Sequence, residues 1–264
     1  MIGDCLGVPF EFKNRGDFKC IDAVGGGAHG KPAWTWSDDT SMMLATLDAM
    51  KSGISAEKIY DNFSNWCFYG KYTTDGHAFD VGGTTYRAIK NRQGQSNIRD
   101  NGNGALMRIL PFVFGDWSDD QITHYAGLTH DHPISHWCCL FYVHFARLLV
   151  KGVEKKKAYK KTCGQMKPKI PQEFSAEFEN IFTISKTKPK RSGGYVVHTL
   201  ECALWAILSY QTFKGAVLGA INLGEDTDTN GALTGGLAGI LWGIPKGWKE
   251  GIEDSLKNQV SLLG

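Results

Sequence analysis

The sequence predicts an all-α protein that forms a single domain over residues 1–264. Apolar residues recur at three- and four-residue spacing along several long stretches, which is typical of helices buried on one face. The alternation of half-buried strands is almost absent, and glycine-rich turns separate the apolar stretches. With 42% apolar and 21% charged residues, the composition is that of an ordinary soluble globular protein.

Six stretches carry the helical pattern most clearly. Ser55 suits the N-cap of the second stretch, with Glu57 in its first turn. Pro133 opens the third, where its missing N–H costs nothing. The expected helices are residues 41–51, 55–69, 133–149, 195–210, 215–223 and 230–242.

The last of these stretches has glycines at regular intervals. Gly231, Gly235, Gly239 and Gly243 fall on one face, and each would weaken an isolated helix by up to about 1 kcal/mol relative to alanine. Such a stripe is tolerated where another backbone packs very close, so we expect this helix at the centre of the protein. Three long glycine-rich loops are expected to hold binding groups: residues 14–36, 70–85 and 91–104.

The totals exclude several classes of function. A net charge of +2 gives no electrostatic argument for nucleic-acid binding, and the basic run at residues 151–161 is typical of a solvated helix face. No apolar stretch approaches the roughly 20 residues that cross a membrane, and the start lacks a signal-peptide pattern. The cysteines are odd in number, irregularly spaced and without a CxxC pair, which favours reduced thiols in the cytoplasm.

Two acidic clusters each precede an apolar helix. Ser37-Asp38-Asp39-Thr40 has more carboxylates and hydroxyls than helix capping needs. The segment at residues 225–231 (EDTDTNG) partly matches a calcium EF-hand loop, but its twelfth position would be Leu237 rather than glutamate, so we reject that interpretation. Together the clusters predict a shared site of carboxylate and hydroxyl oxygens, suited to paired Mg²⁺ or Mn²⁺ ions.

Other motifs do not carry a function. The segment GGGAHGK at residues 25–31 imitates a phosphate-binding loop, but Pro32 replaces the required serine or threonine and no strand precedes it. His124, His130, His132 and His136 are close in sequence but lack an H-E-x-x-H zinc pattern. No G-x-S-x-G elbow of a serine hydrolase is present.

The segment NGNGALMR at residues 101–108 has two interpretations that the residues alone leave open. It is either a tight turn that opens a helix, or a backbone nest whose free N–H groups face an anion such as a phosphate.

The order of these motifs resembles that of the ADP-ribosylglycohydrolase family nearly end to end, and most closely its bacterial dinitrogenase reductase-activating branch. Any one motif is weak, whereas seven in the right order are specific. The matching segments are GDCLG with EF within residues 3–12, SDDT at 37–40, FDVGGTT at 79–85, NGNGALMR at 101–108, TH at 129–130, GY with TLE within 194–201, and GEDTDTNGALTGG at 224–236.

The resemblance implies an orthogonal helical bundle with two Mg²⁺ or Mn²⁺ ions at the base of an ADP-ribose cleft. It implies that Glu11 and Asp80 serve catalysis, with Asp80 facing the scissile bond. The substrate-binding residues that it implies are Gly102, Asn103 and Gly104 at the pyrophosphate, His130 at a ribose and Tyr195 at the adenine. The metal ligands that it implies are Ser37, Asp38, Asp39, Asp226, Asp228 and Thr229.

Three features depart from the family pattern. Ser37 replaces the commoner threonine but keeps its hydroxyl. Glu225 adds a third acid to the second cluster. Met1 lies inside what is normally the first helix, which we therefore expect to be shortened.

The resemblance favours hydrolysis of the N-glycosidic bond between ADP-ribose and a modified protein side chain. The arginine preference rests on the FDVG segment. Within the same fold, the substrate could instead be O-linked serine ADP-ribose, poly(ADP-ribose), or a modified nucleic acid or small molecule that bears ADP-ribose. A different class of function is a non-catalytic module that binds ADP-ribose. No feature indicates a membrane or nucleic-acid partner.

Overall fold

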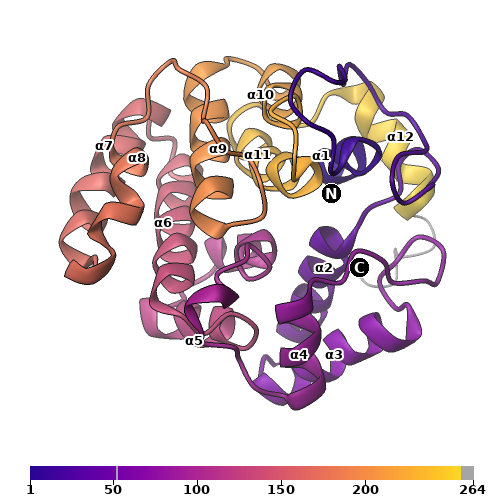
Figure 1. Cartoon of the computed structure of the whole chain (residues 1–264), viewed down its shortest axis with the longest axis horizontal. Helices are drawn as coiled ribbons and strands as arrows, with labels where there is room; N and C mark the ends of the chain where they lie inside the picture. Colours follow the sequence, from indigo (N-terminus) through magenta and orange to yellow (C-terminus); the bar gives the residue numbers. More distant parts are fainter. Residues whose placement is uncertain (52, 257–264) are drawn as a thin grey trace.

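The structure, a computed structural model, describes residues 1–51 and 53–256. Throughout these ranges the regular structure is helical, and extended pairing is limited to isolated bridges, which confirms the all-α prediction (Figure 1). The α-helices are α1 Ile2–Gly7, α2 Asp38–Lys51, α3 Ala56–Tyr69, α4 Gly83–Asn91, α5 Asp119–Gly127, α6 Pro133–Val150, α7 Lys155–Met166, α8 Glu179–Phe182, α9 Val196–Ser209, α10 Phe213–Ile221, α11 Thr227–Trp242 and α12 Lys246–Leu256.

Each of the six predicted helices is present, with starts that differ by a few residues. Ser55 caps α3, its side chain accepting the Lys58 N–H at 3.2 Å, and Pro133 opens α6 as expected. The acidic clusters differ from expectation because α2 begins at Asp38 and α11 at Thr227. The carboxylates of Asp38, Asp39 and Asp228 therefore stand in a first helical turn, while Asp226 is the N-cap of α11.

The glycine stripe places α11 against α1, as its pattern predicts. A Cβ on Gly231 would lie 2.3 Å from the Gly3 carbonyl oxygen, and one on Gly3 would lie 1.9 Å from the Gly231 oxygen. A Cβ on Gly7 would similarly lie 2.4 Å from the Asp228 Cα. Only glycine permits this approach. The N-terminal segment and the second acidic cluster are consequently held backbone to backbone.

Helices α4, α5, α7 and α12 are not among the predicted stretches, because their apolar residues are few. The basic run mostly lies on α7, where Lys156, Lys157, Lys160 and Lys161 are exposed as expected. Lys155 differs: it is buried, and its Nζ donates to the Ile207 carbonyl at the end of α9 at 2.8 Å.

In Figure 1, α2–α4 form the lower right of the molecule and α5–α8 the left side, while α11 lies above the middle between α9, α10 and α1. Buried apolar side chains from nearly all these helices form one large core. All seven cysteines are unpaired, as their pattern predicts. No helix in the described part of the chain is both long and apolar enough to cross a membrane.

Candidate active site

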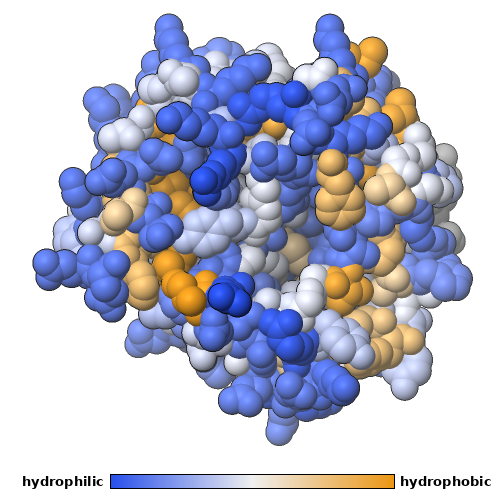
Figure 2. Space-filling model, in the orientation of Figure 1, coloured by the Kyte–Doolittle hydropathy of each residue, from blue (hydrophilic) through white to orange (hydrophobic). Residues whose placement is uncertain are grey.

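A cavity of about 260 Å³ opens between the start of α2, the segment before α4 and the start of α11. Figure 2 shows a hollow near the middle of this face, pale at its floor and rimmed by hydrophilic side chains. Carboxylates, hydroxyls and glycine backbone dominate the lining, which suits a polar ligand. The lining residues are Glu11, Asp38, Asp80, Gly82, Gly83, Thr84, Thr85, Gly102, Asn103, Gly104, Met107, His130, Gly194, Asp226 and Thr229.

Asp4, which is fully buried in α1, fixes the start of α2. Its Oδ1 accepts both the N–H and the hydroxyl of Ser37 at 3.0 Å, and its Oδ2 accepts the Thr40 N–H at 3.0 Å. Asp4 thus satisfies the N–H groups that an N-cap would otherwise take. This is why the helix begins at Asp38, whose carboxylate lines the cavity, while Asp39 lies buried behind it.

The start of α11 brings the second acidic cluster against the first. The Thr229 hydroxyl donates to Asp39 Oδ2 at 3.2 Å, and the Ser37 hydroxyl lies 3.3 Å from the same oxygen. Asp228 Oδ1 accepts the Thr229 N–H at 2.9 Å. Asp226 Oδ2 accepts from the Asn103 side-chain amide at 2.7 Å. The six residues expected to hold metal therefore converge from two helix starts.

The donor set fits hard divalent cations. Carboxylate oxygens of Asp38, Asp80 and Asp228 all lie within 4.8 Å of one another. Asp39 Oδ1 and Asp228 Oδ2 are buried and have no hydrogen-bond partner among the residues that the structure describes. Burial, and then the neighbouring carboxylates, raise the pKa of Asp38, Asp39 and Asp228 well above the ordinary aspartate value. Ions such as Mg²⁺ or Mn²⁺ prefer oxygen ligands and would offset this repulsion.

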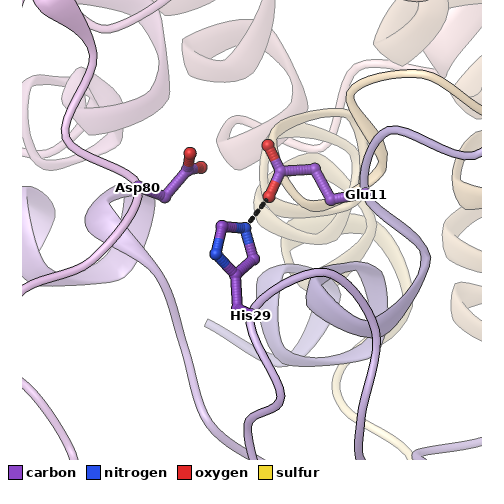
Figure 3. A group of neighbouring side chains, drawn as sticks. All are labelled: Glu11, His29 and Asp80. Atoms are coloured by element: carbon purple, nitrogen blue, oxygen red, sulfur yellow. Dashed lines mark hydrogen bonds and ion pairs between the residues drawn. The ribbon is translucent and has the colours of Figure 1, made fainter.

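Glu11 and Asp80 face one another across the cavity, and His29 lies beside them in contact with Glu11 (Figure 3). His29 Nε2 lies 2.5 Å from Glu11 Oε2. Burial, followed by the nearby acids, raises the pKa of Glu11; burial also raises the pKa of Asp80, though less. Two carboxyl groups whose pKa values are pushed apart in this way are typical of acid–base catalysis.

Asp80 occupies a strained backbone conformation. Its φ is +57°, in the left-handed region that side chains other than glycine rarely adopt. Such a residue costs on the order of 1–3 kcal/mol, and observed strain of this kind is often found at functional sites. Helix α4, which begins three residues later, is anchored by Asp100, which accepts the Thr84 hydroxyl at 2.9 Å and an Arg87 guanidinium N–H.

The NGNG segment forms one wall of the cavity, but only part of it is free to bind an anion. The Asn103 N–H donates to the Gly194 carbonyl at 3.0 Å, so any backbone contact with a ligand falls to Gly102 and Gly104. A Cβ on Gly104 would lie 2.7 Å from His130 Cε1, which shows how closely the ring lies behind the turn. Burial, with Arg108 nearby, lowers the pKa of His130 to about 3, so its ring is neutral.

Tyr195 lies beside this wall rather than in the cavity lining. Its neighbour Gly194 lines the cavity, while the Tyr195 hydroxyl donates to Glu177 Oε2 at 2.9 Å. The ring is half-buried and packs edge-on against His198. Its contact with adenine stays a prediction.

The third acid of the second cluster, Glu225, does not join the carboxylates. Its Oε2 accepts the Ser192 N–H at 3.1 Å. Its backbone pairs with the segment after Glu11, accepting the Phe12 N–H at 2.8 Å and donating to the Lys13 carbonyl at 2.8 Å. Glu225 therefore ties the loop before α9 to the segment that carries Glu11.

Two residues of the site escaped the sequence analysis as functional positions. Asp4 lay in a quoted motif without a role, and His29 lay in the rejected phosphate-loop imitation. The available signal for His29 was a histidine in a loop that has four glycines in six residues. Nothing in the sequence linked this loop to either acidic cluster. None of the four histidines weighed for zinc belongs to a group of candidate metal ligands in the described residues.

Comparison with known proteins agrees with the geometry. The profile of the ADP-ribosylglycohydrolase family matches residues 1–263. The chain is 31% identical to the ADP-ribosylarginine hydrolase Tri1 of Serratia proteamaculans (strain 568), over 94% of this chain and 71% of the relative. It is 28% identical to the ADP-ribosyl-[dinitrogen reductase] glycohydrolase of Rhodospirillum rubrum, over 99% of this chain and 92% of the relative.

A solved structure described as an ADP-ribosylglycohydrolase-related protein complex superposes with a TM-score of 0.80 at 24% identity, covering 99% of this chain and 93% of that one. At that identity the likeness concerns the fold alone, and it extends over the helices that build the cavity.

Proposed function

The chain belongs to the ADP-ribosylglycohydrolase family, and on that premise we propose that it hydrolyses the N-glycosidic bond between ADP-ribose and an arginine side chain of a modified protein. The observation that carries the proposal is the convergence of two carboxylate groups on one cavity. Asp38 in the lining, with Asp39 and Asp228 buried beside it, suits cations, and Glu11 and Asp80 in the lining suit proton chemistry.

The metal part of the proposal assigns two Mg²⁺ or Mn²⁺ ions to Ser37, Asp38, Asp39, Asp226, Asp228 and Thr229. Bound there, such ions supply an anchor for the hydroxyls of the distal ribose and acidify a nearby water. The partnerless oxygens of Asp39 and Asp228 support this assignment, because a buried carboxylate oxygen without a donor is costly unless a cation faces it. Asp80 also lies within reach of Asp38 and Asp228.

Glu11 is assigned the role of general base, which accepts a proton from the attacking water. As the bond from ribose C1″ to the guanidine nitrogen breaks, its electron pair returns to that nitrogen and positive charge develops on the sugar. The water oxygen bonds to C1″, the Glu11 carboxylate takes the released proton, and that proton then passes to the departing neutral guanidine. Asp80 is assigned to bind the guanidinium of the modified arginine, since a carboxylate stabilises the protonated form of that group by charge-assisted hydrogen bonds. The products are arginine and free ADP-ribose, and both atoms and charge balance.

Residues in and beside the wall formed by residues 101–104 are assigned to the nucleotide. Gly102, Asn103 and Gly104 line the cavity where the pyrophosphate is placed; the two glycines offer backbone, and the Asn103 amide is bonded to Asp226 and Thr199. Neutral His130 contacts a ribose hydroxyl, and Tyr195 stacks on the adenine. A modified protein in the cytoplasm is the expected substrate.

The name of the Serratia relative supports arginine over other linkages. Serine-linked ADP-ribose, poly(ADP-ribose) or a small ADP-ribose-bearing molecule would use the same cavity. A non-catalytic binding module would have no use for the Glu11 and Asp80 carboxyls that face one another in the cavity lining.

The test measures free ADP-ribose released from arginine-modified and serine-modified peptides, with and without chelator. We expect release from the arginine peptide alone, and its loss in chelator. Tight ADP-ribose binding without release from either peptide would overturn the enzymatic proposal, and a fully active Asp228→Ala variant would overturn the metal assignment.

A further inference from the structure

His29 has no part in the chemistry described so far, yet its loop is held against the segment that carries Glu11. Gly27 in this loop has a φ of +75°, and a Cβ there would lie 2.4 Å from the Pro9 carbonyl oxygen. Only glycine allows both the conformation and the approach. The loop therefore lies directly on the residues that precede Glu11.

The same loop is also attached to the segment that carries Asp80. Lys31 Nζ lies 2.7 Å from Asp75 Oδ2 and 4.5 Å from the centre of the Phe79 ring. The His29 ring packs between two aromatic rings, with its centroid 5.8 Å from that of Phe12 and 5.0 Å from that of Phe79. These contacts fix the direction of the imidazole before any substrate binds.

His29 contacts Glu11 by a hydrogen bond. Nε2 of the imidazole lies 2.5 Å from Oε2 of the carboxyl, so only one of the two Glu11 oxygens is engaged. In Figure 3 the other Glu11 oxygen and the Asp80 carboxylate point toward the same space.

We propose that His29 is a positioning residue, which holds one Glu11 oxygen so that the other faces the cavity and the attacking water. This inference rests on the proposed hydrolysis, because it assigns Glu11 the proton of that water. A glutamate has three rotatable bonds, and the His29 contact removes most of their freedom before the reaction. Loss of that restraint should lower kcat by about 10- to 50-fold and leave substrate binding unaffected.

Four variants test the proposal in the full-length, Mn²⁺-loaded protein. His29→Leu removes the hydrogen bond at similar volume, and His29→Gln keeps a donor that reaches Glu11. His124→Leu, on an exposed histidine of α5, is the matched control. Glu11→Gln supplies a background in which His29 has no acid to position.

We expect His29→Leu to lower kcat by about 10- to 50-fold, with KM and the calorimetric Mn²⁺ affinity within about three-fold of wild type. His29→Gln should recover part of the loss, and His124→Leu should match wild type. In the Glu11→Gln background, adding His29→Leu should not lower the single-turnover rate further, because His29 affects the rate only by positioning Glu11. An unchanged kcat, an equal loss in both backgrounds, or weakened Mn²⁺ binding would each overturn the proposal.

The inference can be judged separately from the proposed function. If wild-type protein releases no ADP-ribose from any substrate, it is the hydrolysis that fails. A crystal structure of His29→Leu then decides the positioning role: a Glu11 carboxyl turned away from the cavity supports it, and an unmoved Glu11 overturns it.

Discussion

The substitution Asp228→Asn should stabilise the protein when metal is absent and abolish its stabilisation by metal. In the metal-free protein, Asp228 faces Asp38 and Asp80 with carboxylate oxygens within 4.8 Å of one another. Asparagine keeps an oxygen for the Thr229 N–H, which Asp228 Oδ1 accepts at 2.9 Å. It also places an N–H donor where Asp228 Oδ2 now has no partner.

The expected gain in stability depends on how strongly Asp38 and Asp80 repel Asp228, and on the cost of protonating a carboxyl to relieve that repulsion. Two unit charges 4.8 Å apart repel by about 3.5 kcal/mol at an effective dielectric constant near 20, and Asp228 takes part in two such pairs. The penalty is limited by protonation, which at pH 7.5 costs about 5 kcal/mol for a carboxyl of ordinary pKa 3.8. We therefore expect Asp228→Asn to raise the metal-free unfolding free energy by about 2–5 kcal/mol, or Tm by roughly 5–15 °C.

The assay is thermal unfolding followed by circular dichroism in chelator and in excess Mn²⁺. Wild-type protein should gain stability on adding Mn²⁺, while Asp228→Asn should begin higher and gain little. Asp116→Asn, at an exposed aspartate outside the cavity, is the control and should change stability by less than about 0.5 kcal/mol. A metal-free Asp228→Asn protein less stable than wild type, or a wild type indifferent to Mn²⁺ and chelator, would refute the reasoning.

Three further outcomes are expected. Glu11→Gln should lower kcat by about 10²- to 10⁴-fold while calorimetry finds ADP-ribose affinity nearly unchanged; an equal loss of affinity would contradict its assignment to proton transfer. Gly104→Ala should cost about 1–3 kcal/mol in urea unfolding, because its Cβ would lie 2.7 Å from His130 Cε1, whereas Gly102→Ala, whose nearest contact would be 3.4 Å, should cost less. Burial raises the pKa of the cavity carboxyls, including Asp38 and Glu11, so the folded metal-free protein binds more protons than the unfolded chain. The stabilisation by Mn²⁺ should therefore grow as pH rises from about 4. A difference in stability between chelated and loaded protein that stays constant with pH would contradict this.

The helical fold could be predicted from the sequence because its strongest signals are local. Apolar periodicity located six helices, and the glycine stripe of α11 placed that helix against another backbone. The pattern could not identify α1 as that partner, because the contact between Gly3 and Gly231 depends on tertiary packing rather than spacing. The short polar helices such as α4 were missed because they have few apolar residues, and they form where they pack on longer helices such as α3.

Much of the site could be anticipated as a set of residue types. Dense carboxylates at two helix starts indicated a cation, and the structure brings Asp39 and Thr229 within hydrogen-bond distance. The spacing of residues along the sequence could not predict the contacts that hold these side chains in place. Asp4 acts as a cap from another helix, and His29 reaches Glu11 across 18 positions of the chain from a loop that resembled a failed phosphate site. Both contacts depend on tertiary packing, which brings α1 against the start of α2 and the His29 loop against Glu11.

The most direct test of the account is the rate of free ADP-ribose release from an arginine-modified protein, measured by mass spectrometry. Wild type and Asp228→Asn are compared after chelation and after Mn²⁺ or Mg²⁺ is restored. The account predicts release by wild type that chelator abolishes and metal restores, with little release by Asp228→Asn in any condition. Equal release by both proteins in chelator would contradict it.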